Sequence, residues 1–252
     1  MALGASNLTR GFPALVSVAR ERWGSGVEVL AARGHGRSYG SRSRVLVRTL
    51  PGILESGIWA ALERLPAAPT SGLISDVGND ILYGAPAERI LAWVEECALR
   101  LRRHARDVVL TDLPLASVRR LSRARFVSFR TILFPGSRVS LDEVMETAEQ
   151  VVAGLEALAA ARGLRFFRLR PEWYGFDPIH FRARHQLTAF AEMLGVEVSR
   201  RSGFRHGLPG WRSRLEGLRL RALRPEREWL AGVERVRRPD VALACGGRVW
   251  SF

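Results

Sequence analysis

Short apolar runs alternate with longer amphipathic stretches along most of this chain. Five of the runs have the length and the polar or glycine-bearing exits of strands, and they cover residues 2–3, 27–32, 72–77, 107–113 and 164–169. Apolar residues recur at helical spacing in residues 12–23, 56–65, 87–104, 141–161 and 181–194. Alternating strands and helices are typical of a parallel sheet that is covered by helices. We therefore predict an α/β fold.

The amphipathic period is clearest in residues 87–104, where Ile90, Val94 and Leu101 fall on one helical face. Another helix is predicted to begin after Ser140, because Glu143 follows three residues later, as in a capping box. These helices are expected to cover both faces of the sheet. The C-terminal ends of the parallel strands are where such a sheet builds its site.

Two regions lie outside this alternation. Residues 114–138 are rich in arginine and serine and have no clean period, so we interpret them as an insertion after the fourth strand. Near residue 252, two short alternating runs flank Gly246 and Gly247, which predicts a β-hairpin. The length fits one domain. We predict an α/β domain over residues 1–195 and, packed on it, a C-terminal arginine-rich extension over residues 196–252.

The formal net charge is +14, and all 39 basic residues are arginine. Basic residues are densest over residues 200–238, and clustered basic residues favour anionic partners such as nucleic acid. A chain without lysine points instead to a codon bias, and no nucleic-acid-binding motif accompanies the charge. We therefore expect a solvated, partly ion-paired surface, and the pattern argues against nucleic acid as a partner.

The sequence contains no run that approaches the ~18 apolar residues of a membrane helix, and it begins without the features of a secretory signal. This favours a cytoplasmic protein with no membrane span. The two cysteines, Cys97 and Cys245, give neither a disulfide framework nor the spacing of a zinc site. No metal site is predicted.

Residues of catalytic types follow three of the predicted strands. Ser6 comes after the first strand, where a turn into a helix exposes a hydroxyl and backbone N–H groups. Gly34 and Gly36 follow the second strand, and a glycine lets the main chain come close to a substrate. Asn79, in Gly78-Asn79-Asp80, follows the third strand with a side-chain amide that can donate to an oxyanion.

A fourth block, Asp177-Pro178-Ile179-His180, comes after the fifth strand and before the last predicted helix of the α/β region. This spacing lets the carboxylate of Asp177 accept the Nδ1–H of the His180 imidazole. The other ring nitrogen, Nε2, is then left to take a proton from a serine hydroxyl. The pair has the chemistry of a general base and its orienting acid.

These four blocks, in this order over residues 4–180, resemble those of the SGNH (GDSL-type) serine hydrolase family, with this chain a divergent member. The resemblance implies a three-layer α/β/α sandwich with a five-stranded, parallel, flavodoxin-like sheet. It implies a catalytic triad of Ser6, Asp177 and His180, and an oxyanion hole made by the backbone N–H groups of Ser6 and Gly36 and the amide of Asn79. Such enzymes cleave acyl or acetyl esters of small molecules, lipids or sugars through an acyl-enzyme, with no metal or organic cofactor.

Two residues depart from the family's first block. Ala5 stands where the family normally has aspartate, and Asn7 separates Ser6 from Leu8. Neither belongs to the implied triad or oxyanion hole, so both bear on how Ser6 is positioned.

Other interpretations of the second block exist. Residues 34–40 resemble the phosphate-binding loop of FAD-linked oxidases, and residues 36–40 fit the Gly-x-Ser-x-Gly elbow of α/β-hydrolases around Ser38. The first family needs a much longer chain, and the second places several strands before the elbow. Arg33 and Arg37 suggest a substrate whose acyl group is anionic or polar.

The alternative function is a non-catalytic SGNH-like module that binds an anionic partner through its basic surface.

Overall fold

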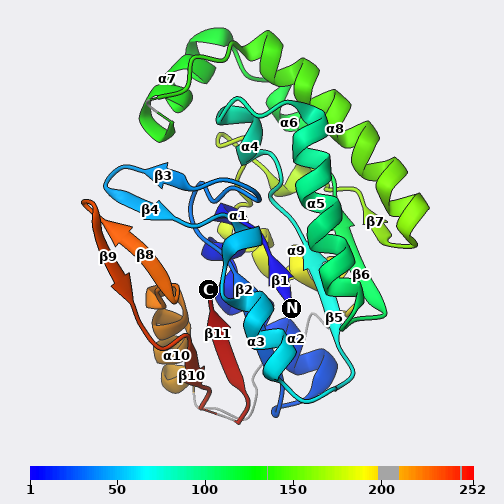
Figure 1. Cartoon of the computed structure of the whole chain (residues 1–252), viewed down its shortest axis with the longest axis vertical. Coiled ribbons are helices and arrows are strands. Elements are labelled where there is room, and N and C mark those ends of the chain that lie inside the picture. Colours follow the sequence, from blue (N-terminus) through cyan, green and yellow to red (C-terminus); the bar gives the residue numbers. More distant parts are fainter. Residues whose placement is uncertain (135, 198–209, 245) are drawn as a thin grey trace.

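A mostly parallel sheet lies at the centre of the molecule (Figure 1). The computed structural model describes residues 1–134, 136–197, 210–244 and 246–252. The sheet has seven strands in the order β10-β11-β2-β1-β5-β6-β7. Its parallel core consists of the five predicted strands, which are β1 (Ala2–Leu3), β2 (Glu28–Ala32), β5 (Ser71–Ile74), β6 (Asp107–Thr111) and β7 (Arg165–Phe167). The predicted α/β class is confirmed, and the order of these five strands is flavodoxin-like.

Helices cover both faces of the sheet (Figure 1). One core contains the apolar sides of α3 (Ile58–Arg64), α5 (Ala87–Arg102) and α8 (Leu141–Arg162). The other contains those of α1 (Ser6–Arg10), α2 (Phe12–Trp23) and α9 (Gln186–Met193). Successive strand residues face the two cores in turn, since Leu30 of β2 lies in the first and Val29 in the second. The strands are buried on both faces, which is why they appear in the sequence as continuous apolar runs.

The helix starts and ends agree with the sequence pattern in most places. The Ser140 hydroxyl accepts the N–H of Glu143 at 3.2 Å, and the Glu143 carboxylate accepts the N–H of Ser140 at 2.7 Å, so the capping box is present. The helix expected over residues 181–194 is shorter. It begins with a 3₁₀ turn, η3 (Ala183–His185), because the N–H of Arg182 donates back to the Trp173 carbonyl and keeps the preceding residues in a loop.

Residues 114–138 follow the fourth strand and contain two helices that their pattern did not predict, α6 (Leu115–Val118) and α7 (Arg123–Leu133). The Ser122 side chain begins α7 by accepting the N–H of Arg125 at 3.4 Å. The helix packs against α8 and lies at the end of the molecule that also holds α4 (Asn79–Leu82) (Figure 1). Among the α7 residues whose burial is described, only Phe126 is buried.

The predicted hairpin is formed by β10 (Asp240–Ala242) and β11 (Arg248–Ser251). It extends the sheet itself, because β11 pairs in parallel with β2 and turns the expected five strands into seven. Gly247 has a φ of 77°, and a Cβ there would lie 2.3 Å from the Val27 carbonyl oxygen, so only glycine fits. Cys245 lies outside the described residues. The domain boundary at residue 195 stays a prediction.

A second, antiparallel sheet was not predicted. It contains β3 (Ser43–Val45), β4 (Arg48–Leu50), β8 (Arg227–Leu230) and β9 (Val233–Val236). Glu228 of β8 is fully buried and forms ion pairs with Arg48 at 2.6 Å and Arg237 at 2.5 Å. Burial acts to raise the pKa of Glu228, but the two guanidinium groups outweigh it and lower that pKa. This second sheet therefore links the segment that follows Gly34 and Gly36 to the C-terminal extension.

The basic extension is ion-paired in part, as the sequence suggests. In α10 (Gly210–Ala222), Glu216 accepts two hydrogen bonds from the buried Arg20 guanidinium, at 2.5 and 2.9 Å. Residues 200–209, the first part of the basic stretch, lie outside the described residues. Within the part of the chain that the structure describes, no helix has the length and apolar character needed to cross a membrane.

Candidate active site

The four sequence blocks converge at the C-terminal edge of the parallel sheet, because neighbouring parallel strands end at the same edge. Ser6 is the first residue of α1, directly after β1, and its side chain is almost fully buried. Asn79 begins α4 after β5, next to β1 in the sheet. Ser6 and Asn79 line the same cavity.

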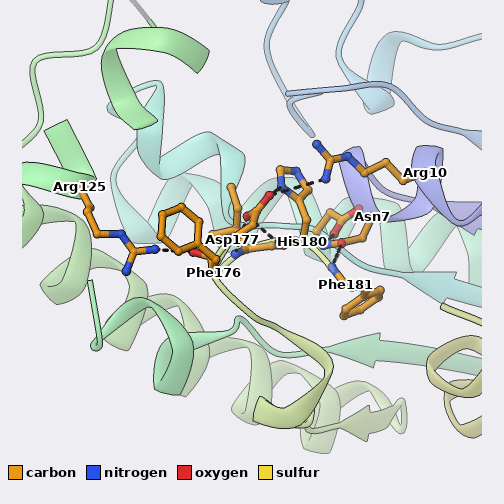
Figure 2. Close-up of polar contacts among 9 residues, drawn as sticks. Asn7, Arg10, Arg125, Phe176, Asp177, His180 and Phe181 are labelled. Atoms are coloured by element: carbon orange, nitrogen blue, oxygen red, sulfur yellow. Dashed lines mark hydrogen bonds and ion pairs between the residues drawn. The ribbon is translucent and has the colours of Figure 1, made fainter. Parts of the chain in front are cut away.

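Asp177 and His180 lie in the loop before η3 and form a direct contact (Figure 2). The distance between His180 Nδ1 and Asp177 Oδ2 is 2.6 Å, and the N–H groups of Ile179 and His180 donate to Asp177 Oδ1. Burial acts to raise the pKa of Asp177. The hydrogen bond and charge of His180, the N–H of Ile179 and the nearby Arg10 outweigh burial and lower this pKa, so the carboxylate is ionised at neutral pH.

The imidazole of His180 is itself 7% exposed, and its Nδ1 contact leaves Nε2 as the atom that can accept a proton. The hydrogen bonds among the described residues do not include one between Ser6 Oγ and His180. Catalytic hydrogen bonds often tighten only when substrate is bound. The contact between nucleophile and base therefore stays a prediction.

Asn7 connects the Ser6 turn to the His180 loop (Figure 2). Its amide nitrogen donates to the carbonyl of Ile179 at 2.8 Å, and its amide oxygen accepts the N–H of Phe181 at 2.8 Å. These two partners are the residues on either side of His180. The side chain that follows Ser6, one of the two departures from the family pattern, thus ties the serine turn to both neighbours of the histidine.

Asp76, at the end of β5, supplies a carboxylate to the same turn. Its Oδ2 atom accepts the N–H groups of Ala5 at 2.9 Å and Leu8 at 3.1 Å, and its Oδ1 atom accepts the amide of Asn7 at 2.8 Å. The main chain at Asp76 has a φ of 59°, which is uncommon outside glycine and marks a constrained site. Ala5 has no side chain able to cap this turn, and Asp76 caps it from the neighbouring strand.

The second block approaches Asn79 through its main chain. The amide nitrogen of Asn79 lies 3.4 Å from the carbonyl oxygen of Arg37, and the Tyr83 hydroxyl donates to the carbonyl of Gly36 at 2.7 Å. Gly36 has a φ of 63°, and a Cβ there would lie 2.4 Å from a methyl group of Val45. The position therefore requires glycine. A Cβ at Gly34 would clash with the Leu50 side chain, so this position also requires glycine.

Ser38 and Tyr39 fix this loop from inside the core. The Ser38 hydroxyl and the N–H of Tyr39 both donate to the buried carboxylate of Asp80, and the Tyr39 hydroxyl donates to the Ser75 carbonyl at 2.7 Å. Burial raises the pKa of Asp80 to about 6, although the two donors oppose this shift. Ser38 is fully buried, so the interpretation of Ser38 as an exposed nucleophile is wrong.

Arg33 and Arg37 are also buried, and neither lines the cavity beside Ser6. Arg37 donates to the main-chain oxygens of Pro51 at 3.1 Å, Arg33 at 3.2 Å, and Phe252. Arg33 donates to the Leu223 carbonyl at 3.1 Å, and its guanidinium carbon lies 4.2 Å from the centre of the Phe12 ring. The hint that these two residues bind an anionic acyl group is therefore wrong, because both serve packing.

Comparisons with known proteins agree with this architecture. No protein-family model matches the chain, and no curated protein matches it. A solved structure of a carbohydrate acetylesterase family member from Sinorhizobium meliloti is 17% identical with a TM-score of 0.51, and the match covers 77% of this chain and 93% of that one. The chain has an esterase-like fold. The psychrotrophic esterase EstA from Pseudoalteromonas sp., inhibited by monoethylphosphonate, is 12% identical with a TM-score of 0.48 over 77% of this chain and 93% of its own.

The esterase-like fold leaves a cavity of about 130 Å³ beside Ser6. The strand ends of β5 and β6 form one side, and α4, α6, α7 and α8 form the other. Among the described residues, no group of three or more His, Cys, Asp or Glu side chains could hold a metal ion.

The sequence patterns did not reveal the roles of two residues in this region, Asn7 and Asp76. Asn7 stood out only as a departure, and Asp76 only as a neighbour of the third block. Their partners lie far along the chain, at 172 residues for Asn7 and Ile179 and 71 for Asp76 and Ala5, so no local pattern could have indicated them.

Proposed function

We propose that this protein is a serine hydrolase that cleaves a carboxylic ester, with Ser6 as nucleophile, His180 as general base and Asp177 as its orienting acid. The observation that carries the proposal is the Asp177–His180 contact of 2.6 Å, in a loop that Asn7 ties to the residue next to Ser6. A serine, an imidazole and a carboxylate are the elements of a nucleophilic triad.

In the proposed reaction, Ser6 Oγ attacks the ester carbonyl carbon while His180 Nε2 takes the hydroxyl proton. The carbonyl oxygen becomes an oxyanion, which the N–H groups of Ser6 and Gly36 and the amide of Asn79 stabilise. Each such donor contributes about 3 kcal/mol to the transition state. The protonated His180 then gives its proton to the leaving alcohol, and an acyl-enzyme on Ser6 remains.

Deacylation repeats the sequence with water. His180 Nε2 takes a proton from the water as its oxygen attacks the acyl carbonyl, the same donors stabilise the second oxyanion, and the carboxylic acid leaves as Ser6 regains its proton. The lowered pKa of Asp177 supports this role, because an ionised carboxylate stabilises the imidazolium that forms in both halves.

The two similar solved structures are described as an esterase and a carbohydrate acetylesterase, which favours a small-molecule acyl or acetyl ester as substrate. The proposed reaction needs no metal or organic cofactor, because the nucleophile, base and oxyanion donors are all protein groups.

The test is hydrolysis of p-nitrophenyl butyrate by the wild type and by Ser6→Ala, together with fluorophosphonate labelling. Ser17→Ala is the matched control, since the Ser17 hydroxyl only donates to the Pro13 carbonyl within α2. We expect Ser6→Ala to lose activity and labelling while Ser17→Ala keeps both. If the wild type neither turns over nor becomes labelled, the proposal fails and the non-catalytic module that binds an anionic partner becomes the better interpretation.

A further inference from the structure

The cavity beside Ser6 identifies the class of acyl group, if the proposed function holds. We propose that the substrate is an ester of a straight alkyl acid of about four to six carbons, whose chain occupies this cavity when its carbonyl lies at Ser6. The proposal rests on three features of the cavity, namely its continuity with the site, its apolar wall and its size.

The cavity reaches two of the proposed site residues. Ser6 and Asn79, the proposed nucleophile and an oxyanion donor, both line it. An acyl group whose carbonyl lies between these two residues therefore has its chain at the mouth of this space.

The wall away from the strand ends is apolar except for Arg130, whose guanidinium donates to the Val139 carbonyl at 2.7 Å. It is built by side chains from α4, α7 and α8, including Leu82, Phe126, Phe134, Val144 and Ala148. A wall of this kind favours methylene groups and disfavours a sugar hydroxyl, which would lose its hydrogen bonds to water there.

The two carboxylates at the strand ends, Asp76 and Asp112, are already bonded within the protein, whereas the Thr111 hydroxyl beside them has no hydrogen-bond partner among the described residues. Asp76 accepts three hydrogen bonds from the Ser6 turn. Asp112 accepts the N–H of Leu169 at 2.7 Å. These carboxylates hold loops in place, so the apolar wall decides what the cavity binds.

The volume sets the chain length. An apolar cavity of ~150 Å³ holds a benzene-sized ligand. The cavity here, at about 130 Å³, therefore takes a chain of roughly four to six carbons. An acetyl methyl group would leave most of it empty. Until the cavity is full, each further methylene that is buried raises kcat/KM about fourfold.

The wall is also connected to the proposed oxyanion hole. Phe134, at the end of α7, packs edge-on against Tyr83 with 5.2 Å between ring centres, and the Tyr83 hydroxyl bonds to the Gly36 carbonyl. The helices of residues 114–138, which the sequence analysis interpreted as an insertion, thus close the cavity next to the second block.

The experiment measures kcat/KM for p-nitrophenyl acetate, butyrate, hexanoate, octanoate and decanoate. The enzymes are the wild type, Ala148→Leu, which fills the cavity, and Val144→Ala, which enlarges it. Ala157→Leu is the control, because it makes the same change at an exposed position of the same helix. Urea unfolding checks that each variant is folded.

We expect the wild type to prefer butyrate or hexanoate over acetate by at least about tenfold, as two or more buried methylenes imply. Ala148→Leu should lower the ratio of hexanoate to acetate activity by about tenfold, and Val144→Ala should shift the optimum towards octanoate. Ala157→Leu should match the wild type. Val144→Ala introduces no steric clash, so it tests the proposal even if Ala148→Leu does not fold.

Highest activity on acetate, with the same profile in Val144→Ala, would overturn the acyl-chain proposal and leave the esterase proposal intact. Hydrolysis of none of the esters, with no labelling of Ser6, would overturn both. The two failures are therefore distinguishable.

Discussion

Asn7→Ala is the substitution that tests most directly how the site is held together. The Asn7 side chain makes three hydrogen bonds of 2.8 Å, to Asp76, to the Ile179 carbonyl and from the Phe181 N–H. It is 7% exposed, so water cannot easily replace it. Alanine keeps the main chain of the Ser6 turn and removes its side-chain bonds to the His180 loop and to Asp76 Oδ1.

The expected cost follows from the groups that lose their partner. The carbonyl of Ile179 and the N–H of Phe181 are left without the amide, and a buried polar group without a partner costs about 1–3 kcal/mol. Two such groups lower the free energy of unfolding by about 2–6 kcal/mol, unless the loop moves to reach water. If it moves by ~1 Å, His180 is displaced from Ser6 and kcat falls by about 100-fold.

The assay is urea unfolding together with separate kcat and KM values for p-nitrophenyl butyrate. We expect kcat to fall by about 100-fold with KM within threefold, because the apolar side chains of the cavity wall are unchanged. Thr9→Ala is the control. The Thr9 hydroxyl donates to the Ala5 carbonyl at 2.6 Å within the same turn and makes no contact with the His180 loop. It should lose stability of about 1 kcal/mol and keep kcat.

The reasoning is refuted if Asn7→Ala keeps kcat within threefold of the wild type while its unfolding free energy drops. In that case Asn7 stabilises the fold without positioning the catalytic groups.

Two further predictions concern carboxylates. Asp177→Asn should lower kcat by about 10³- to 10⁴-fold in the butyrate assay with the fold intact by circular dichroism, because an amide neither fixes the imidazole tautomer nor stabilises its cation; a loss below tenfold would contradict the proposed role. Asp80 is buried, with its folded pKa raised to about 6. Its contribution to stability is therefore present at pH 4 and is lost as the pH rises to about 6, by up to about 3 kcal/mol. Asp80→Asn should remove this loss, so its unfolding free energy relative to the wild type should increase between pH 4 and 6.5, and parallel urea curves across that range would rule the effect out.

The parallel core and the order of the four blocks were predictable because both depend on local features of the sequence. Strands that are buried on both faces are continuous apolar runs, and residues at their C-terminal ends meet at one edge. These two rules are enough to bring Ser6, Gly36 and Asn79 to the same side of the sheet.

The second sheet and α7 were not predictable for a different physical reason. Strands β3 and β4 have three residues each, too few to show a period. Helix α7 has only eleven residues, and it lies in a stretch rich in arginine and serine, so its pattern did not stand out from a loop. The role of Asn7 depends on partners 172 residues away, which only the fold brings close.

The pairing of β11 with β2 also constrains how this chain reaches its native state. The outer edge of β2 stays open until residues from the opposite end of the sequence arrive, and contacts of such long range form slowly. An open edge is a template for strands of other molecules. We therefore expect slow refolding, and aggregation at high protein concentration. Removing residues 240–252 would leave the edge of β2 open permanently, and it would also remove the hydrogen bond from Arg37 to Phe252.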